Sequence, residues 1–214
     1  MISSNKFYER YWNKEAPPEN DPTTPGRIRL LQTTFNRLNI KKGKILDAGC
    51  GSGYFCKLFK NMEFEVCGID ISENAIKKAK SLYPEIEFKI SVLDDRIPYP
   101  DNSFEIVWSS EVIEHIFCVY KYLTEINRVL KTKGYYILTT PYHGLIKNML
   151  IVLFGFDKHF CNIEGGHIRF FTNKYLYRLL YRFGFEVIES IYIGRIPPIA
   201  KSVYIVSRKV RDAK

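Results

Sequence analysis

Residues 44–53 read Lys44-Ile45-Leu46-Asp47-Ala48-Gly49-Cys50-Gly51-Ser52-Gly53, a short apolar run closed by an acid and followed by alternate glycines. An amphipathic segment comes next, so the order predicts a strand, a tight glycine turn and a helix. Glycine permits positive φ and lets a ligand approach the backbone closely, while the first N–H groups of the next helix favour a polar or negative group. The segment therefore predicts a cofactor-binding turn. The turn alone is weak evidence, because several cofactor-binding folds share it and a purely structural turn can have the same letters.

Strands and helices alternate from this segment onward. Apolar patterning predicts strands over 45–48, 65–70, 86–91, 104–109 and 135–140, and helices over 54–60, 72–82 and 119–130. Ser72 suits the N-cap of its helix, and Gly134 follows a helix end where a left-handed turn is expected. Such alternation implies right-handed crossovers and a parallel sheet that is covered on both faces. A further helix, over 27–38, is expected before the first strand.

The pattern changes after Pro141. Residues 144–155 are nearly all apolar, and residues 156–171 add aromatic side chains, two histidines and a glycine pair. An apolar run of this length is too short to span a bilayer, which takes about twenty residues. We therefore expect an inserted helix that either caps the site or rests on a membrane interface. Residues 144–171 are interpreted as an inserted lid or acceptor-binding segment.

The sheet resumes near the C-terminus. Thr172 suits the cap of a helix that Gly184 ends, and two alternating segments, 185–193 and 202–207, predict strands. The loop between them is too short for a crossover helix, so these strands should be antiparallel. The predicted fold class is α/β: a seven-stranded, mostly parallel sheet with the last strand antiparallel, helices on both faces and a small inserted cap after strand 5. We interpret 1–214 as a single domain with N-terminal helices within 1–40, one of them an aromatic helix over 3–13.

Composition favours a folded protein with reduced thiols. Hydrophobic residues make up 46% of the 214 residues, which argues against disorder. The net charge of +9 comes from scattered lysines and arginines, so a solvated basic surface is favoured over a nucleic-acid groove. The five cysteines form no Cys-x-x-Cys pair, and the N-terminus has no apolar signal segment. We therefore expect a cytoplasmic protein, and a peripheral place at the inner face of the membrane stays open.

Two acids flank the glycine turn. Asp70 ends the predicted second strand, where a carboxylate can accept hydrogen bonds from both hydroxyls of a ribose. Asp47 precedes the turn, where it can orient the loop as a structural cap or bind the ammonium of an amino acid. This pair predicts a ligand that contains a nucleoside.

Five segments occur in an order that carries a family resemblance. They are Leu46-Asp47-Ala48-Gly49-Cys50-Gly51-Ser52-Gly53, Gly68-Ile69-Asp70, Ile97-Pro98-Tyr99-Pro100-Asp101-Asn102-Ser103-Phe104-Glu105, Glu111-Val112-Ile113-Glu114-His115-Ile116 and Arg128-Val129-Leu130-Lys131-x-x-Gly134. Together they resemble the class I S-adenosylmethionine (SAM)-dependent methyltransferases. The chain looks closest to the ubiquinone-biosynthesis O-methyltransferases and to methyltransferases of surface-polysaccharide pathways, and the second comparison also covers 155–160 and 165–172. The resemblance implies a Rossmann-like fold, SAM as cofactor and S-adenosylhomocysteine as product.

The resemblance also implies which residues bind SAM. Asp47, Gly49 and Gly51 match the motif that lines the methionine end, and Asp70 matches the acid that binds the ribose. Arg27 is similar in position to an arginine that holds the SAM carboxylate in the quinone enzymes. The family usually has an acid directly after the third strand, beside the adenine, but this sequence has Ser91-Val92-Leu93 there, so the adenine role passes to Asp94 or to the backbone of Leu93. The complete predicted set is Arg27, Asp47, Gly49, Cys50, Gly51, Asp70, Ile71, Asp94 and Ser110.

Methyl transfer from a sulfonium is an in-line displacement, so alignment supplies much of the acceleration, and a base must remove the proton of a hydroxyl acceptor. The predicted catalytic residues are His143, His167 and His115, with His143 or His167 as base or acceptor-positioning group and His115 as a wall of the site. Glu111 and Glu114 are the carboxylate alternatives. We predict no metal, because no Cys–His cluster has ligand spacing. His159 and His167 with Asp157 or Glu164 form only a weak divalent-metal candidate.

The leading interpretation is a SAM-dependent methyltransferase acting on a small-molecule or glycan-precursor acceptor, most simply a hydroxyl. Two alternatives stay open: a SAM-binding regulatory protein without turnover, and a methyltransferase for quinone or lipid precursors that contacts a membrane through 144–156. A nicotinamide oxidoreductase is disfavoured by the ordered motifs. A nucleic-acid methyltransferase is disfavoured because Ser109-Ser110-Glu111 stands where its Asn/Asp-Pro-Pro-Tyr/Phe signature belongs. The sequence does not specify the oligomeric state.

Overall fold

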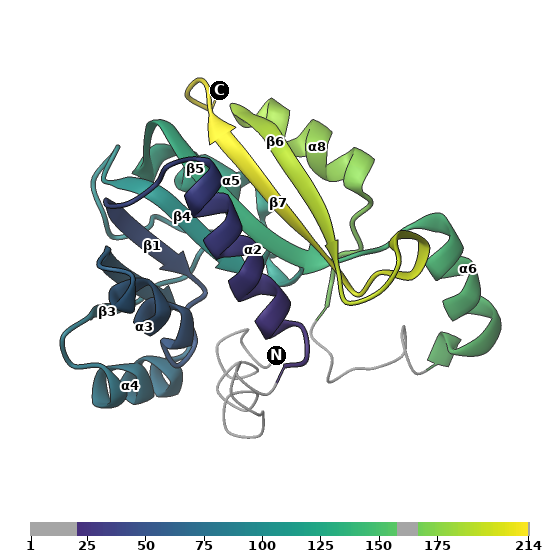
Figure 1. The fold of residues 1–214 in the computed structure, drawn as a ribbon, viewed down its shortest axis with the longest axis horizontal. Coiled ribbons are helices and arrows are strands. Elements are labelled where there is room, and N and C mark those ends of the chain that lie inside the picture. The colour runs from purple at the N-terminus through teal and green to yellow at the C-terminus, as the bar shows by residue number, and fades with distance from the viewer. Residues whose placement is uncertain (1–20, 158–166, 214) are drawn as a thin grey trace.

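The computed structural model describes residues 21–157 and 167–213, and in them the strands form one seven-stranded sheet of order β3-β2-β1-β4-β5-β7-β6 (Figure 1). The strands are β1 (Lys44–Ala48), β2 (Glu65–Asp70), β3 (Glu87–Ile90), β4 (Phe104–Ser110), β5 (Leu130–Pro141), β6 (Phe185–Ile193) and β7 (Ser202–Lys209). Pairs β1–β2, β1–β4, β2–β3 and β4–β5 are parallel, whereas β7 pairs antiparallel with both β5 and β6. The predicted fold class, with its reversed last strand, is confirmed.

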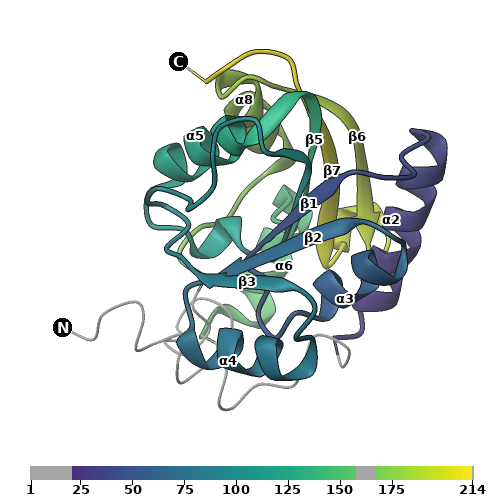
Figure 2. The same cartoon turned by 90° about the vertical axis from the view of Figure 1, so that its left-hand side faces the viewer.

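Helices cover both faces of the sheet, as Figure 2 shows for α5 and α8 on one side and α2 and α3 on the other. They are α2 (Thr24–Arg37), α3 (Tyr54–Asn61), α4 (Glu73–Leu82), α5 (Val119–Val129), α6 (Leu145–Phe154) and α8 (Asn173–Arg182), with short 3-10 helices η2 (Ile113–His115) and η3 (Pro197–Ile199). Two hydrophobic cores result. Leu123 of α5 and Leu180 of α8 pack in one, and Phe35 of α2 and Phe59 of α3 pack in the other.

The helix ends follow local chemistry. The side chains of Ser72 and Thr172 accept hydrogen bonds from the N–H groups of Ala75 and Tyr175, as N-caps do. The left-handed turn expected at Gly134 is wrong: helix α5 ends at Val129, and Lys133 has the positive φ of 67°. A β-carbon at Gly134 would lie 2.8 Å from two backbone carbonyl oxygens, so this glycine serves close backbone packing inside β5.

The strand order places a switch point between β1 and β4. The chain runs from β1 outward to β2 and β3, and then crosses to β4 on the other side of β1. In open α/β sheets, ligands bind at the carboxyl ends of the strands at such a point. The glycine turn follows β1 and the segment Glu111–His115 follows β4, so both lie at this switch point.

The expected inserted helix is present as α6, which projects beyond the sheet near the β6–β7 connection (Figure 1). None of its residues is buried, although eight of its ten are apolar. Lys147 of this helix binds the neighbouring backbone: its Nζ donates to the carbonyl oxygens of Tyr142 at 2.8 Å and Ala200 at 3.0 Å. The predicted helix over 3–13, together with His159 and Glu164, lies outside the described residues.

Candidate active site

The glycine turn after β1 has a backbone that favours glycine. Gly49, Gly51 and Gly53 have φ angles of 88°, 52° and 84°, and Gly53 is the N-cap of α3. A β-carbon on Gly49 would lie 2.4 Å from Cγ2 of Val112, which is too close for two carbon atoms. The turn is therefore packed directly against the segment after β4. This contact joins the two halves of the candidate site.

Asp70 orders the same turn from the end of β2. Its Oδ2 accepts a hydrogen bond from the N–H of Gly51 at 2.9 Å, and its Oδ1 accepts one from the N–H of Ser72 at 2.9 Å. Its side chain is buried. Each carboxylate oxygen has two lone pairs, so a carboxylate can accept more than one hydrogen bond at each oxygen. Ribose binding by Asp70, with the adjacent Ile71, stays a prediction.

Asp47 on β1 is a buried carboxyl group beneath the turn. Burial raises its pKa to about 7, and the charge of Asp70 adds to this rise, whereas a hydrogen bond that the Cys56 thiol donates at 3.3 Å opposes it. Within residues 21–157 and 167–213, no lysine or arginine forms an ion pair with Asp47. The neighbouring Cys50 is also buried, and burial raises the pKa of its thiol to about 11.

Arg27 of α2 reaches the same region from the other side. It is 4% exposed, and its guanidinium forms ion pairs with Asp21 at 3.1 Å and with Glu111 at 3.2 Å. Its Nε is buried and has no hydrogen-bond partner among the described residues. Arginine presents several donors in a fixed planar fork, so this side chain retains a donor for a further acceptor.

Two acids follow β4, of which Glu114 is buried and Glu111 is partly buried. Glu111 has a φ of 54°, a conformation that is rare for a residue with a side chain, and its N–H donates to Thr139 of β5 at 2.9 Å. Glu114 is 1% exposed, and its Oε2 accepts a hydrogen bond from Thr140 at 3.0 Å. Burial raises the pKa of both carboxyl groups, and for Glu114 the charge of Glu111 adds to the effect.

His115 and His167 come together beside these acids. Their rings meet edge to face with centroids 4.8 Å apart. Two backbone bonds hold the distant segments in contact, because the N–H groups of Ile168 and Arg169 donate to the carbonyl oxygen of Glu114 at 3.1 and 3.2 Å. Two of the three predicted catalytic histidines are thus neighbours.

His143, the third, makes different contacts just past the end of β5. Its side chain is buried, its Nδ1 lies 3.1 Å from Oδ1 of Asn148 on α6, and its ring meets that of Phe170 edge to face at 4.8 Å. Helix α6 and residues 167–172, which lead to α8 and are called the return segment below, therefore both pack on His143. Its role as a base stays a prediction.

The last two predicted cofactor residues have structural partners. Oδ2 of Asp94 accepts a hydrogen bond from the N–H of Cys118 at 2.8 Å, which positions the start of α5. The hydroxyl of Ser110 lies 3.0 Å from that of Thr139 on β5. The described contacts neither assign nor remove the adenine role predicted for Asp94.

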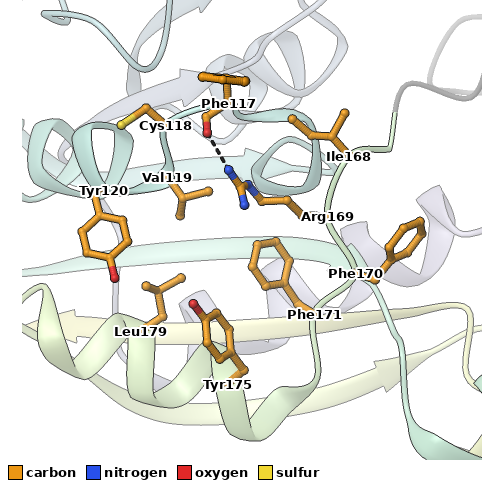
Figure 3. Close-up of a pocket in the computed structure, with 10 residues that line it drawn as sticks. All are labelled: Phe117, Cys118, Val119, Tyr120, Ile168, Arg169, Phe170, Phe171, Tyr175 and Leu179. Atoms are coloured by element: carbon orange, nitrogen blue, oxygen red, sulfur yellow. Dashed lines mark hydrogen bonds between the residues drawn. The ribbon is translucent and has the colours of Figure 1, made fainter.

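A separate pocket of about 420 Å³ lies between the start of α5, the return segment and α8 (Figure 3). Its wall is largely aromatic, and Arg169 crosses it to donate to the carbonyl oxygen of Phe117 at 2.6 Å. The lining residues are Phe117, Cys118, Val119, Tyr120, Ile168, Arg169, Phe170, Phe171, Tyr175 and Leu179. The glycine turn is not among them, so this pocket is distinct from the predicted cofactor site.

Two features of the site escaped the sequence predictions: the Arg27–Glu111 ion pair and the contact of Glu114 and His115 with His167. The available signal was local. Three ionisable residues, Glu111, Glu114 and His115, fall within five positions directly after a buried apolar strand. Such a density of charge beside a strand end indicates a site, but it does not identify the distant partners.

Comparison with known proteins gives a consistent family. Residues 25–190 match the family described as "Methyltransferase domain". A Mycolicibacterium smegmatis protein named "Probable S-adenosylmethionine-dependent methyltransferase" is 29% identical over 69% of this chain and 53% of its own length. A Buchnera aphidicola malonyl-[acyl-carrier protein] O-methyltransferase is 29% identical over 82% of this chain and 66% of its own. A solved SAM-dependent methyltransferase from Methanosarcina mazei superposes with a TM-score of 0.65 and 22% identity, covering 80% of this chain and 94% of that one.

The chain spans about half the length of the mycobacterial relatives that it matches. Among the helices of the described residues, none is both long enough and apolar enough to cross a bilayer.

Proposed function

This chain belongs to the methyltransferase domain family, and we propose that it binds SAM at the glycine turn and transfers the methyl group to an oxygen of a small-molecule or glycan-precursor acceptor. Relatives and solved neighbours named as SAM-dependent methyltransferases support the cofactor and the reaction class. The observation that carries the proposal is the positive-φ glycine turn, bonded through Gly51 to the buried carboxylate of Asp70 at 2.9 Å.

The residues present fit SAM in three respects. Gly49 and Gly51 leave the turn without β-carbons, so a ligand can approach the backbone. Asp47 is a buried acid with no ion-paired cation in the described part of the chain, which suits a ligand ammonium. Arg27 keeps a buried Nε without a partner among those same residues, which suits a ligand carboxylate.

When bound, SAM supplies an electrophilic methyl group on a sulfonium. The chain's own residues then have to hold the cofactor, orient the acceptor and receive a proton. The cofactor would be held by Arg27, Asp47, Gly49, Cys50, Gly51, Asp70, Ile71 and Ser110. Asp94 would lie toward the adenine. His143 or His167 would orient the acceptor or take its proton at an imidazole nitrogen, with His115 as a wall of the site.

An oxygen acceptor is favoured over a nitrogen or carbon acceptor by one comparison and one structural feature. The Buchnera aphidicola relative is named an O-methyltransferase. In this chain, histidines and buried carboxyl groups gather after β4 and β5, and these groups can accept the proton that a hydroxyl must lose.

Radiolabelled SAM tests this function directly. The protein would be incubated with the label and, in separate reactions, with hydroxyl-bearing glycan precursors, quinone precursors and malonyl-acyl carrier protein. A hydroxyl acceptor yields an ether that resists mild alkali, whereas a carboxylate acceptor yields an ester that releases labelled methanol. SAM binding by calorimetry without any transfer, across all fractions of a cell extract, would instead favour a regulatory SAM-binding protein.

A second candidate, transfer to a lipid or quinone precursor at a membrane surface, is favoured by helix α6. Leu145, Leu153 and Phe154 are 76%, 68% and 83% exposed, and Ile196 in the adjacent β6–β7 connection is 67% exposed. Helix α6 contains no acid. Burial lowers the pKa of Lys147, and the positive charge of the nearby, exposed Arg195 lowers it further. An apolar helix with flanking positive charge suits an anionic interface.

Vesicle sedimentation separates this candidate from the first. The protein would be mixed with phosphatidylcholine vesicles, with and without phosphatidylglycerol. Membrane action predicts co-sedimentation that increases with the anionic lipid and is lost in a Leu153→Asp, Phe154→Asp double variant. Tyr181→Ser is the matched control, since Tyr181 is 66% exposed on α8. Absence of co-sedimentation with either lipid would leave only the soluble acceptor.

A further inference from the structure

One cluster of potential metal ligands lies just beyond the predicted cofactor turn. A carboxylate oxygen of Glu114 and one imidazole nitrogen each from His115 and His167 all lie within 4.8 Å of one another. They come from two segments far apart in the chain, the stretch after β4 and the return segment that leads to α8. The cluster shares His167 with the weak candidate seen in the sequence.

The buried acid in this cluster has an unmet requirement. Glu114 is 1% exposed, and its Oε1 has no hydrogen-bond partner in the described residues, while Oε2 accepts from Thr140 at 3.0 Å. Leaving a buried carboxyl oxygen without a partner is costly. Nε2 of His115 lies 3.9 Å from the same Oε1, which is beyond hydrogen-bond range. A cation between the two groups would satisfy the oxygen.

Backbone hydrogen bonds hold the residues of this cluster in place. The carbonyl oxygen of Glu114 accepts from the N–H groups of Ile168 and Arg169, so the residue directly after His167 is bonded to the residue directly before His115. The Thr140 hydroxyl orients the carboxylate, as outer partners of metal ligands commonly do. Arg169 adds a bond from its Nε to the carbonyl oxygen of Ile116 at 3.1 Å.

We propose that Glu114, His115 and His167 bind one divalent transition-metal ion of the class of Zn²⁺ or Co²⁺. Two imidazoles and one carboxylate form a ligand set that these ions accept. Ligand atoms around a tetrahedral zinc ion lie about 3.4 Å apart, given bonds of about 2.1 Å. The present cluster extends to 4.8 Å, so binding requires the ligand atoms to move inward by about 1 Å, and His167 is the exposed member of the three.

Three protein ligands leave at least one position open at the ion. If the proposed methyl transfer is correct, that position suits the acceptor oxygen, because a bound divalent ion lowers the pKa of a coordinated hydroxyl and so assists loss of its proton. This part of the inference rests on the proposed function. The metal site itself does not, and it replaces the prediction from sequence that no metal is bound.

Titration of the full chain with CoCl₂, in the absence of SAM and acceptor, tests the site. Calorimetry should give one equivalent, and visible absorption should show d–d bands without the intense near-ultraviolet bands of a cobalt–thiolate bond. ZnCl₂ should displace the Co²⁺. His167→Asn should weaken Co²⁺ binding at least 10-fold, and so should His115→Asn and Glu114→Gln, because each removes one of three ligands.

His143→Asn is the matched control, since it removes a histidine outside the cluster, and circular dichroism would confirm that each variant is folded. Retention of wild-type Co²⁺ affinity in His167→Asn overturns the proposal, and so does an equal loss of Co²⁺ affinity in His143→Asn. Cobalt–thiolate bands, or the absence of one-to-one binding, overturn it as well. Because neither SAM nor an acceptor is present, a failure here is separate from a failure of methyl transfer.

Discussion

Nη2 of Arg27 lies 3.2 Å from Oε1 of Glu111, so a residue of the first described helix is paired with the residue that follows β4. Glu111 is directly followed by Val112, whose side chain lies against Gly49 of the glycine turn. The charge of Arg27 partly offsets the partial burial of Glu111, which raises the pKa of that carboxyl group. The same arginine is the predicted partner of the SAM carboxylate.

Arg27→Gln should weaken SAM binding by about 10-fold or more, because a charge-assisted hydrogen bond to a carboxylate contributes about 1.5–3 kcal/mol. Arg29→Gln is the control, since Arg29 is exposed on the same helix. Calorimetric titration with SAM measures both. Equal affinity of the two variants would remove Arg27 from the cofactor site and leave it as a structural partner of Asp21 and Glu111.

Asp70→Ala should abolish measurable SAM binding or weaken it by at least 10-fold. The variant loses the predicted ribose acceptor, and it also leaves the N–H groups of Gly51 and Ser72 without their present acceptor. Glu73→Ala, nearby on α4 and exposed, should bind like the wild type. Thermal melts of both variants distinguish a lost contact from a lost fold, and unchanged affinity in a folded Asp70→Ala protein would contradict the assignment.

SAM binding should release a proton near pH 6. Burial raises the pKa of Asp47 to about 7, so the free protein holds this proton below pH 7. A ligand ammonium favours the ionised carboxylate and lowers that pKa, so SAM affinity should increase as pH rises toward 7, by up to about tenfold per unit. Calorimetry at pH 6 in buffers of different ionisation enthalpy counts the proton. In Asp47→Asn the count should fall to zero, and an unchanged count would place the titrating group elsewhere.

His143→Ala should lower turnover by roughly 10²-fold while SAM affinity stays within about twofold of the wild type, if His143 removes the acceptor proton or positions it. Steady-state kinetics with an identified acceptor, combined with SAM calorimetry, separate the two quantities. His167→Ala provides the comparison. Full turnover in both variants would transfer proton removal to water or to a carboxyl group such as Glu114.

Lys209→Met should destabilise the fold by about 2 kcal/mol, because buried carbonyl groups would lose their donor. Lys209 is 1% exposed, and its Nζ donates to the carbonyl oxygens of Asn127 at 2.8 Å and Leu130 at 3.0 Å. Arg208→Met, at the neighbouring and more exposed position of β7, should change stability by less than about 0.5 kcal/mol. Urea denaturation measures both, and similar midpoints would show that the lysine contributes nothing beyond its methylenes.

Most of the fold could be predicted from sequence because its determinants are local. Strands β2 and β6 and the caps Ser72 and Thr172 follow from apolar periodicity and from side chains that bond their own helix. The error at Gly134 has a physical cause: glycine suits both a left-handed turn and close backbone packing, and only the distance to the carbonyl oxygens of Glu105 and Lys131 distinguishes them.

The candidate site could be predicted only in part. The order of motifs located the glycine turn and Asp70, because these residues are near one another in the chain and share one strand–turn–helix–strand unit. The pairing of His115 with His167 could not be predicted, since it depends on how the return segment bonds to Glu114. Likewise, nothing local to Arg27 indicates that Glu111 will be its partner.

The ammonium group of Lys147 also has a mechanical consequence. It donates to carbonyl oxygens at the end of β5 and in the β6–β7 connection, and it belongs to α6. The apolar helix and the β6–β7 connection are therefore tied to each other by hydrogen bonds from a single ammonium group. Asn148, one residue further along α6, contacts His143, so a displacement of α6 would change the surroundings of the imidazole that follows β5.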